Sequence, residues 1–234
     1  ILHKIREEER KVLYDQYYGM EKEGVTGIVQ RVMGKNVSIN LGKADAILAE
    51  NEQVRGEEFH PTEHIKVYIL EVKDTPKGPR IQVSRTHPGL VKRLFESEVA
   101  EVRDGTVEIK SIAREAGSRT KIAVWSNDPD VDPVGACVGM NGARVNSIVE
   151  ELRGEKIDII NWDENPAILI ENALSPAKVI AVMADPDEKT ALVVVPDYQL
   201  SLAIGKEGQN ARLAARLTGF KIDIKSETQA KESG

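Results

Sequence analysis

Two pairs of glycines are the residues in this chain best suited to bind a charged ligand. Gly139 and Gly142 enclose two residues, and Gly205 and Gly208 repeat that spacing 66 positions later, counting from 139 to 205. Each pair lies between two short apolar runs with helical spacing. The start of the second helix then exposes backbone N–H groups, which can bind a phosphodiester. Because glycine has no side chain, the phosphate can come close to the backbone.

The residues around the two turns are repeated as well. Each turn is followed by an amphipathic run and then by the same tetrapeptide, at Lys156 to Ile159 and at Lys221 to Ile224. A predicted hairpin precedes each turn, and the first strand of the second hairpin is expected over Ala177 to Met183. The resulting order is helix, strand, strand, helix, helix, strand. A Gly-x-x-Gly turn in this order is typical of a type II KH module, whose turn clamps an RNA backbone. We predict two such modules, over 87–162 and 163–226.

The middle positions of the two turns differ in charge. The second turn contains Lys206, which can contact a phosphate, beside the opposing carboxylate of Glu207. The first turn is neutral, with Asn141 as a hydrogen-bond donor and Arg144 two positions after the closing glycine. The two predicted clamps are therefore not equivalent.

Basic side chains flank both turns. Arg212 and Arg216 are one turn apart on the helix after the second turn, where they form either a basic stripe or ordinary solvated surface. Arg119 and Lys121 on a strand of the first module leave the same two interpretations open. The residues predicted to contact RNA are Gly139, Met140, Asn141, Gly142, Arg144, Arg119, Lys121, Gly205, Lys206, Glu207, Gly208, Asn210, Arg212 and Arg216.

The segment before the two modules has a different periodicity. Apolar and polar residues alternate over Val37 to Leu41, and five short strand candidates separated by Gly and Pro turns occupy residues 24–86. This pattern favours a five-stranded OB-type barrel. Residues 1–23 are predicted to be helical, and 227–234 to be a polar, frayed tail. The predicted class is an α+β multidomain chain with a helix, a barrel and two KH modules.

The composition restricts the surroundings of the protein. The net charge of −6 is unusual for a nucleic-acid binder, so local basic groups and backbone amides would have to attract RNA. The single cysteine, Cys137, cannot form an internal disulfide, which fits a reducing cytoplasm. The chain has neither a long apolar run nor a signal-peptide pattern. We expect a cytoplasmic monomer without membrane contact.

The sequence does not favour an enzyme. His60 and His64 are four positions apart but have a proline between them, so a helix need not align them as a metal pair. Asp128, Asp130 and Asp132 alternate, yet the later ligands of a calcium loop are missing. No phosphate-binding P-loop and no Gly-x-Ser-x-Gly motif is present. We therefore predict no catalytic residues, no metal site and no cofactor.

Three stretches carry a resemblance to a known family: Gly117 to Val124, Asp132 to Val145 and Ala203 to Ala214. Together with the order of helix, barrel, KH and KH, they resemble the NusA family of bacterial transcription elongation and termination factors, whose barrel is of the S1 type. The resemblance implies binding to nascent single-stranded RNA, to RNA polymerase and to other elongation and antitermination factors. It also implies that residues 1–23 are the connecting helix of a polymerase-binding domain that would precede residue 1.

The chain departs from that family in two places. The middle of the first turn is often basic in the family and is neutral here, and the segment from Gly24 to Leu41 has no aromatic side chain on which a base could stack. Two alternatives stay open. One is an accessory module of an RNA-processing enzyme, and the other is a protein-interaction scaffold whose KH folds do not bind RNA.

Overall fold

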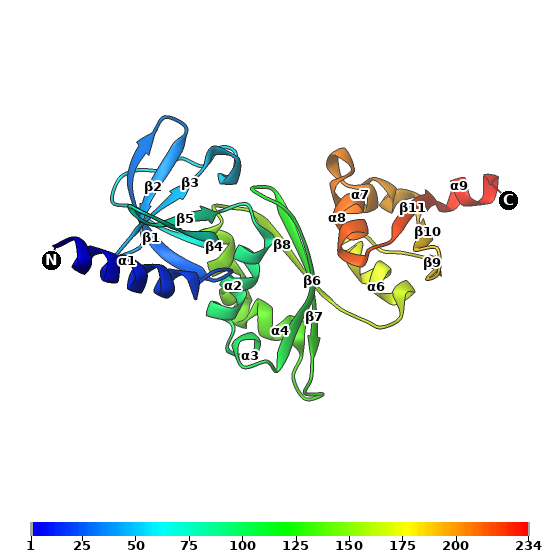
Figure 1. Cartoon of the computed structure of the whole chain (residues 1–234). Coiled ribbons are helices and arrows are strands. Elements are labelled where there is room, and N and C mark those ends of the chain that lie inside the picture. Colours follow the sequence, from blue (N-terminus) through cyan, green and yellow to red (C-terminus); the bar gives the residue numbers. More distant parts are fainter. Residues whose placement is uncertain (1, 234) are drawn as a thin grey trace. The chain divides into compact units, whose positions relative to one another are not determined.

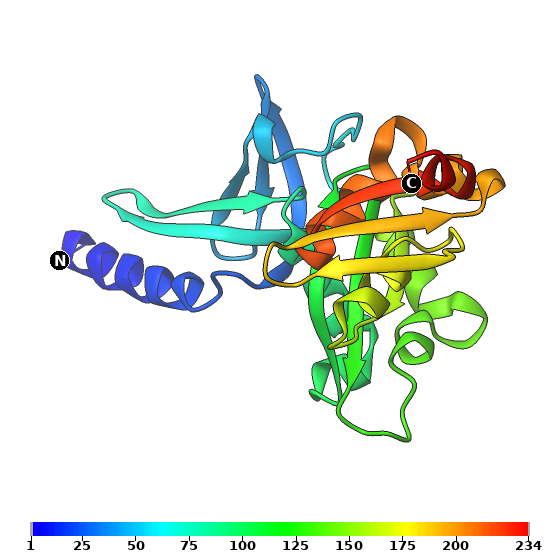
Figure 2. The same ribbon diagram turned by 90° about the vertical axis from the view of Figure 1, so that its right-hand side faces the viewer.

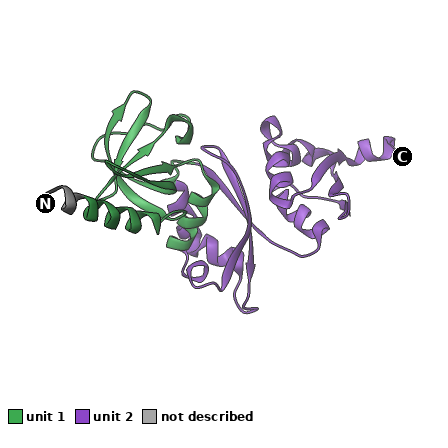
Figure 3. Ribbon diagram, viewed as in Figure 1, with its two compact units in different colours: residues 1–97, 150–154 green, residues 98–149, 155–234 purple. Residues whose placement is uncertain are grey.

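The computed structural model describes residues 2–233, with side chains from Glu7 onward, and these residues form two compact units (Figure 3). The first unit contains residues up to 97 together with 150–154. The second contains residues 98–149 and everything from 155 onward. No helix in residues 2–233 is long and apolar enough to cross a bilayer.

The first unit contains a closed barrel and the helices α1 and α2 (Figure 1). Its elements are α1 (Leu2–Tyr18), β1 (Gly24–Met33), β2 (Asn36–Asn40), β3 (Asp45–Leu48), β4 (His64–Thr75), β5 (Gly78–Ser84) and α2 (Pro88–Glu98). The strands follow the order β1-β2-β3-β5-β4, which confirms the predicted five-stranded barrel. Tyr17 of α1 packs into the barrel core, and its hydroxyl group donates to the carbonyl oxygen of Leu41 at 3.0 Å. This contact fixes the end of the helix on the barrel.

Most of the first KH module belongs to the second unit. After α2, its elements are α3 (Ala100–Arg103), β6 (Val107–Glu115), β7 (Arg119–Ser126), α4 (Pro133–Val138), η2 (Met140–Gly142), α5 (Ala143–Glu151) and β8 (Lys156–Asn161). Strand β7 lies in the middle of the sheet, antiparallel to β6 and parallel to β8. This arrangement confirms the predicted type II order. The short helix α3 was not predicted because four residues carry too little periodicity.

The second KH module repeats this topology. Its elements are α6 (Pro166–Ala173), β9 (Ala181–Asp185), β10 (Thr190–Val195), η3 (Asp197–Gln199), α7 (Leu200–Ile204), η4 (Lys206–Gly208), α8 (Gln209–Thr218), β11 (Lys221–Ser226) and α9 (Glu227–Glu232). Strand β10 is the middle strand, antiparallel to β9 and parallel to β11, as Figure 2 shows from the side. The two sheets thus have the same connectivity.

Two predicted boundaries in the second module were wrong. The first strand was expected from Ala177, but β9 begins at Ala181 because Ala177 is buried in a loop that closes α6. The end of the chain was expected to fray, but residues 227–232 form α9. A capping box between Ser226 and Gln229 stabilises the first turn of this helix, since each side chain bonds to the backbone of the other residue.

One hydrophobic core joins the two KH modules inside the second unit. Ala113, Ala123 and Ile160 from the first sheet belong to the same cluster as the buried residues of α6 and α8. The hydroxyl group of Ser111 donates to the carbonyl oxygen of Leu217 at 2.5 Å across this contact. The two KH modules of the second unit are therefore packed tightly against each other.

Candidate nucleic-acid interface

The two glycine turns have the same backbone conformation. Gly139 has φ 77° and ψ 172°, and Gly205 has φ 80° and ψ 169°. The third residues are left-handed, with φ 55° and ψ 27° at Asn141 and φ 55° and ψ 25° at Glu207. The closing glycines have φ values of 77° and 76°. The sequence repeat is therefore also a repeat of backbone conformation, although the residues between the glycines differ in the two turns.

The first glycine of each turn is required by packing as well as by its φ angle. A Cβ atom at Gly139 would lie 2.8 Å from Cγ of Arg144, and one at Gly205 would lie 2.7 Å from the backbone nitrogen of Asn210. Contacts this short require the following helix to move. The helix after each turn can therefore pack directly on the glycine only because no side chain is present.

The closing glycines have more room. A Cβ atom at Gly142 would meet only the side chain of Asn146, with its nearest atom at 3.1 Å. At Gly208 the nearest atom would be Nη1 of Arg212 at 3.8 Å. The outer side of each turn is thus open enough for a ligand to approach the backbone.

Backbone N–H groups are exposed at the first turn. The Gly142 N–H donates to the carbonyl oxygen of Gly139 at 3.1 Å, and the Ala143 N–H donates to that of Met140. Within the described chain, this leaves the N–H groups of Met140 and Asn141 without an acceptor. The second turn bonds in the same way. Both side chains between the first pair of glycines are exposed, so solvent or a phosphate can reach these donors.

Arg144 stabilises the first turn through hydrogen bonds within its own module. Its Nη1 atom donates to the carbonyl oxygen of Ala136 at 2.8 Å and to a carboxylate oxygen of Glu101 at 2.6 Å. The pKa of Glu101 lies below its usual value because of a backbone hydrogen bond and the bond from Arg144. The guanidinium group predicted to contact RNA therefore points back into its own module and ties α4 to α5.

Asn210 occupies the matching position, five residues after the first glycine of the second turn. It is buried, and its amide group donates to the carbonyl oxygens of Ala203 at 2.9 Å and Leu174 at 3.0 Å. Its Oδ1 atom is buried and has no hydrogen-bond partner in the described part of the chain. Like Arg144, it holds the helices on both sides of the turn together.

The predicted basic stripe on α8 is paired with a carboxylate from the other module. Arg212 binds Glu115 of β6 with two hydrogen bonds of 2.6 and 2.8 Å, and Arg216 lies 3.5 Å from the same carboxylate. Arg212 also donates to the carbonyl oxygen of Glu207 inside the second turn at 3.0 Å. The hydrogen bond from Arg212 lowers the pKa of Glu115. Both arginines are exposed, so they can still reach a ligand.

The other predicted basic pair is bound to Asp158 of β8. Arg119 makes two hydrogen bonds of 2.7 and 2.8 Å to this carboxylate, and Lys121 makes one of 2.9 Å. Lys121 is completely buried and also donates to the carbonyl oxygen of Ser175 in the second module at 2.7 Å. Burial lowers the pKa of Lys121. The lysine belongs to the contact between the modules, whereas Arg119 keeps part of its surface exposed.

Two pockets open along β8. One, of about 340 Å³, lies at the start of the strand and is lined by Arg119, Lys156 and the second turn from Gly205 to Lys206. The other, of about 540 Å³, is lined by Val134 of α4, by the end of β8 and by residues 171–179. Residues of both KH modules thus line a pocket at each end of β8.

Glu115 and Asp158 are not among the residues predicted from the sequence. Asp158 is the third residue of the repeated tetrapeptide, so its recurrence was a usable signal. Nothing in the sequence marks Glu115, because its partner lies 97 residues away. Among the side chains that the structure describes, from Glu7 to Ser233, no group of three or more metal-ligating residues could hold an ion.

Family models and curated relatives match this architecture. A model of the NusA-like first KH domain matches residues 85–162, and one of the NusA-like second KH domain matches residues 166–232. A protein of Mycobacterium bovis named "Transcription termination/antitermination protein NusA" is 46% identical over all of this chain, which covers 70% of that protein. This chain belongs to the NusA family. The NusA-named proteins of Bacillus subtilis and Halalkalibacterium halodurans are 59% and 56% identical over the whole chain.

The match to NusA covers only part of some relatives. The chain spans 63% of the length of the Bacillus subtilis protein and 61% of the Halalkalibacterium halodurans protein. Both NusA-like KH domain matches lie within the part that this chain shares with these longer relatives.

Proposed function

We propose that this chain is the RNA-binding portion of a transcription factor that contacts nascent RNA at RNA polymerase and modulates pausing, termination and antitermination. An S1-type barrel at 24–86 and KH modules at 87–162 and 163–226 would together form this portion. The main support is the pair of turns, since the same unusual backbone conformation with exposed N–H groups occurs twice. The printed names of the relatives support the role in transcription.

The mechanism follows from the geometry of the turns. A phosphodiester would accept hydrogen bonds from the two free N–H groups of each turn, where the helix that follows adds a partial positive charge. Lys206 would add one ionic contact at the second turn. The bases would then lie in the pockets along β8, where side chains are partly apolar.

The predicted residues divide into two groups under this proposal. The turns themselves, the partly exposed Arg119 and the exposed Arg212 and Arg216 would contact RNA. The three arginines would exchange their carboxylate partners for phosphates. Arg144, Asn210 and Lys121 would act as positioning residues, because their N–H donor groups already bond to carbonyl oxygens inside the protein.

RNA polymerase and other elongation or antitermination factors are the proposed protein partners. In this proposal polymerase is contacted mainly through a domain that precedes the connecting helix in the family. The site of action would be the cytoplasm, with the protein as a monomer and without membrane contact.

The test is a titration of labelled single-stranded RNA with the chain at several salt concentrations, with a duplex of the same sequence as control. We expect single-stranded RNA to bind, the duplex to bind more weakly, and the affinity to fall as salt rises. If neither RNA binds, the protein-interaction scaffold is favoured. A pausing assay with polymerase and the longer family protein then distinguishes a transcription factor from an RNA-processing module, since only the former changes pause duration.

A further inference from the structure

Both tryptophans of the chain lie at one place, near the 540 Å³ pocket along β8. Trp125 is on β7, and Trp162 directly follows β8. Their rings meet edge to face, with centroids 5.7 Å apart and an interplanar angle of 88°. The backbone N–H of Trp162 donates to the carbonyl oxygen of Val124 at 2.8 Å, which holds the two backbone segments that carry the indoles side by side. Trp125 is 37% exposed, so solvent reaches part of its surface.

A pocket of about 420 Å³ lies against the two rings. It is within the range of roughly 300–1,000 Å³ that is usual for small-ligand sites. The pocket shares Asn161 and Asn172 with the 540 Å³ pocket along β8, so the two pockets are neighbours. Pro133 of α4 lines the pocket beside the indoles, and the next residue, Val134, lines the 540 Å³ pocket.

Helix α4 also relates the pocket to the first turn. The helix starts at Pro133 beside the indoles and ends at Val138, directly before Gly139. Six helical residues span about 9 Å. A KH module clamps four nucleotides of RNA backbone. An RNA strand bound at the first turn would therefore reach the indoles within those four nucleotides or at the next one.

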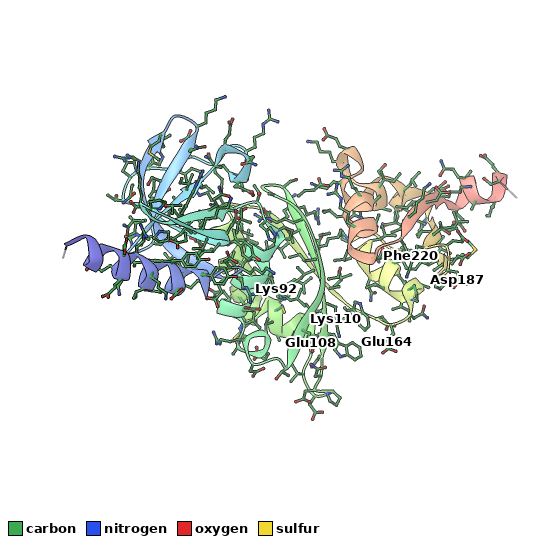
Figure 4. All side chains as sticks on the ribbon, viewed as in Figure 1. Lys92, Glu108, Lys110, Glu164, Asp187 and Phe220 are labelled. Atoms are coloured by element: carbon green, nitrogen blue, oxygen red, sulfur yellow. The ribbon has the colours of Figure 1, made fainter. Side chains whose placement is uncertain are left out.

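The charges around the pocket favour a base over a phosphate. Asp128 and Asp163 line it, and their carboxylates would repel a phosphate but accept hydrogen bonds from base edges. Lys110 lies 5.2 Å from the centre of the Trp162 ring and 2.9 Å from Glu108 (Figure 4). The lysine thus places one cation beside the ring, where the backbone of a bound strand could pass.

We propose that the Trp125–Trp162 pocket is a nucleobase-stacking subsite, which takes a base of single-stranded RNA as the strand leaves the groove of the first KH module. Bases stack on exposed aromatic side chains without strict sequence preference. This subsite would supply, on the KH module, the aromatic stacking surface that the first strands of the barrel lack. The inference rests on the RNA binding proposed above.

The fluorescence of the protein gives a direct readout, because the chain has no tryptophan outside this pocket. Intrinsic emission and the anisotropy of labelled RNA can be followed in one titration with an oligonucleotide of about ten nucleotides, longer than one KH cleft holds. We expect tryptophan emission to be quenched with the same midpoint as the anisotropy change.

Two substitutions at Trp125 separate stacking from packing. Trp125→Phe keeps an aromatic face, whereas Trp125→Leu keeps apolar volume without one. We expect the leucine variant to bind RNA roughly tenfold more weakly, from about 1–3 kcal/mol per stacked base, and the phenylalanine variant to lose much less. Tyr18→Ala, an exposed aromatic truncation on α1 in the other unit, should leave the affinity unchanged. Melting curves show whether each variant is folded.

The outcomes are distinct. If RNA binds but emission stays constant and the leucine and phenylalanine variants bind equally well, the subsite is wrong while the RNA-binding function stands. If wild-type protein binds no RNA, the proposed function fails and the subsite fails with it.

Discussion

The first and second KH turns have the same backbone and different chemistry. Both turns place their glycines at positive φ. In both, the side chain five residues after the first glycine, Arg144 or Asn210, donates a hydrogen bond to the helix that precedes the turn. Between the glycines, the first turn exposes the neutral Met140 and Asn141, and the second exposes Lys206 and Glu207. The glycine positions thus determine the backbone shape of each turn. The charge of each turn depends on the residues between the glycines and, at the second turn, also on Glu115 of the neighbouring module.

At the second turn, a carboxylate from the neighbouring module contributes to the local charge. Glu115 of the first module holds Arg212, which in turn bonds to the carbonyl oxygen of Glu207. At the first turn, Arg144 and Glu101 both belong to the first module. We therefore expect RNA binding at the second turn to depend more on salt and on substitutions in its neighbour.

The largest expected effect concerns the two glycines within one turn. Gly205→Ala places a Cβ atom 2.7 Å from the Asn210 backbone, so we expect about 3 kcal/mol or more of lost stability. Gly208→Ala has open space and should cost only about 1 kcal/mol for its positive φ. Urea denaturation measures both. Equal losses would contradict the packing role given to the first glycine.

The next effect concerns the contact between the modules. Lys121→Met removes a buried cation from Asp158 and from the Ser175 carbonyl oxygen, while Arg119 remains. Breaking a buried ion pair costs about 3–5 kcal/mol, and the remaining arginine should place this variant near the lower end. RNA affinity, measured where the protein is folded, should change less than about twofold, since Lys121 is buried. A large loss of affinity without a loss of stability would restore Lys121 as an RNA contact.

A smaller effect, in the opposite direction, is expected at Glu115. Glu115→Gln frees Arg212 and Arg216 for phosphates, so single-stranded RNA should bind several-fold more tightly. The slope of log affinity against log salt should become steeper by about 0.7 for each new phosphate contact. Asp187→Asn is the matched control, because it makes the same charge change on an exposed loop of the second module (Figure 4). If both variants gain equally, only net charge matters and the pairing with Glu115 has no specific role.

The pH dependence of this pair has a definite sign. Because the pKa of Glu115 is lowered in the folded protein, its pair with Arg212 is fully formed above the ordinary glutamate pKa. The stabilisation is lost as pH falls through the lowered value. The difference in stability between wild type and Glu115→Gln, measured by denaturation, should therefore be constant from neutral pH down to the ordinary value and shrink only below it. A change near neutral pH would contradict the assignment.

The smallest effect is expected at the helix before the first turn. Cys137 is buried there, 66 positions before Ala203 in the second module, and burial raises the pKa of its thiol to about 11. A thiol reagent should therefore react with the native protein at pH 8 only as fast as it unfolds. Cys137→Ala makes the two helices alike at this position and should cost about 1 kcal/mol. Rapid labelling of the native state would show that this helix opens.

The sequence predicted the features that depend on local pattern. The glycine turns, the type II order and the five barrel strands follow from glycine positions and from the two hydrophobic periodicities. The start of β9 was placed four residues early because Ala177, Val179 and Ile180 are apolar as in a strand, although residues 177–180 form a loop. The helix at 227–232 was missed because its residues are polar and its stability depends on one capping box.

Side-chain partners could not be predicted, because they depend on tertiary contacts. The sequence shows that Lys121 is basic, but not that it meets Asp158 and Ser175 in the interior. Likewise, the spacing of Arg212 and Arg216 predicts a stripe without revealing the carboxylate that covers it. These residues needed the packing of one module on the other before a role could be assigned.

The most direct test of the account compares aspartate with asparagine at the closing glycines. Both residues tolerate left-handed backbone and have nearly the same size, so only the charge beside the exposed N–H groups differs. We predict that G142D/G208D binds labelled single-stranded RNA at least about tenfold more weakly than G142N/G208N, while both melt at similar temperatures. Equal RNA affinities for the two double variants would contradict the binding of phosphates at the turns.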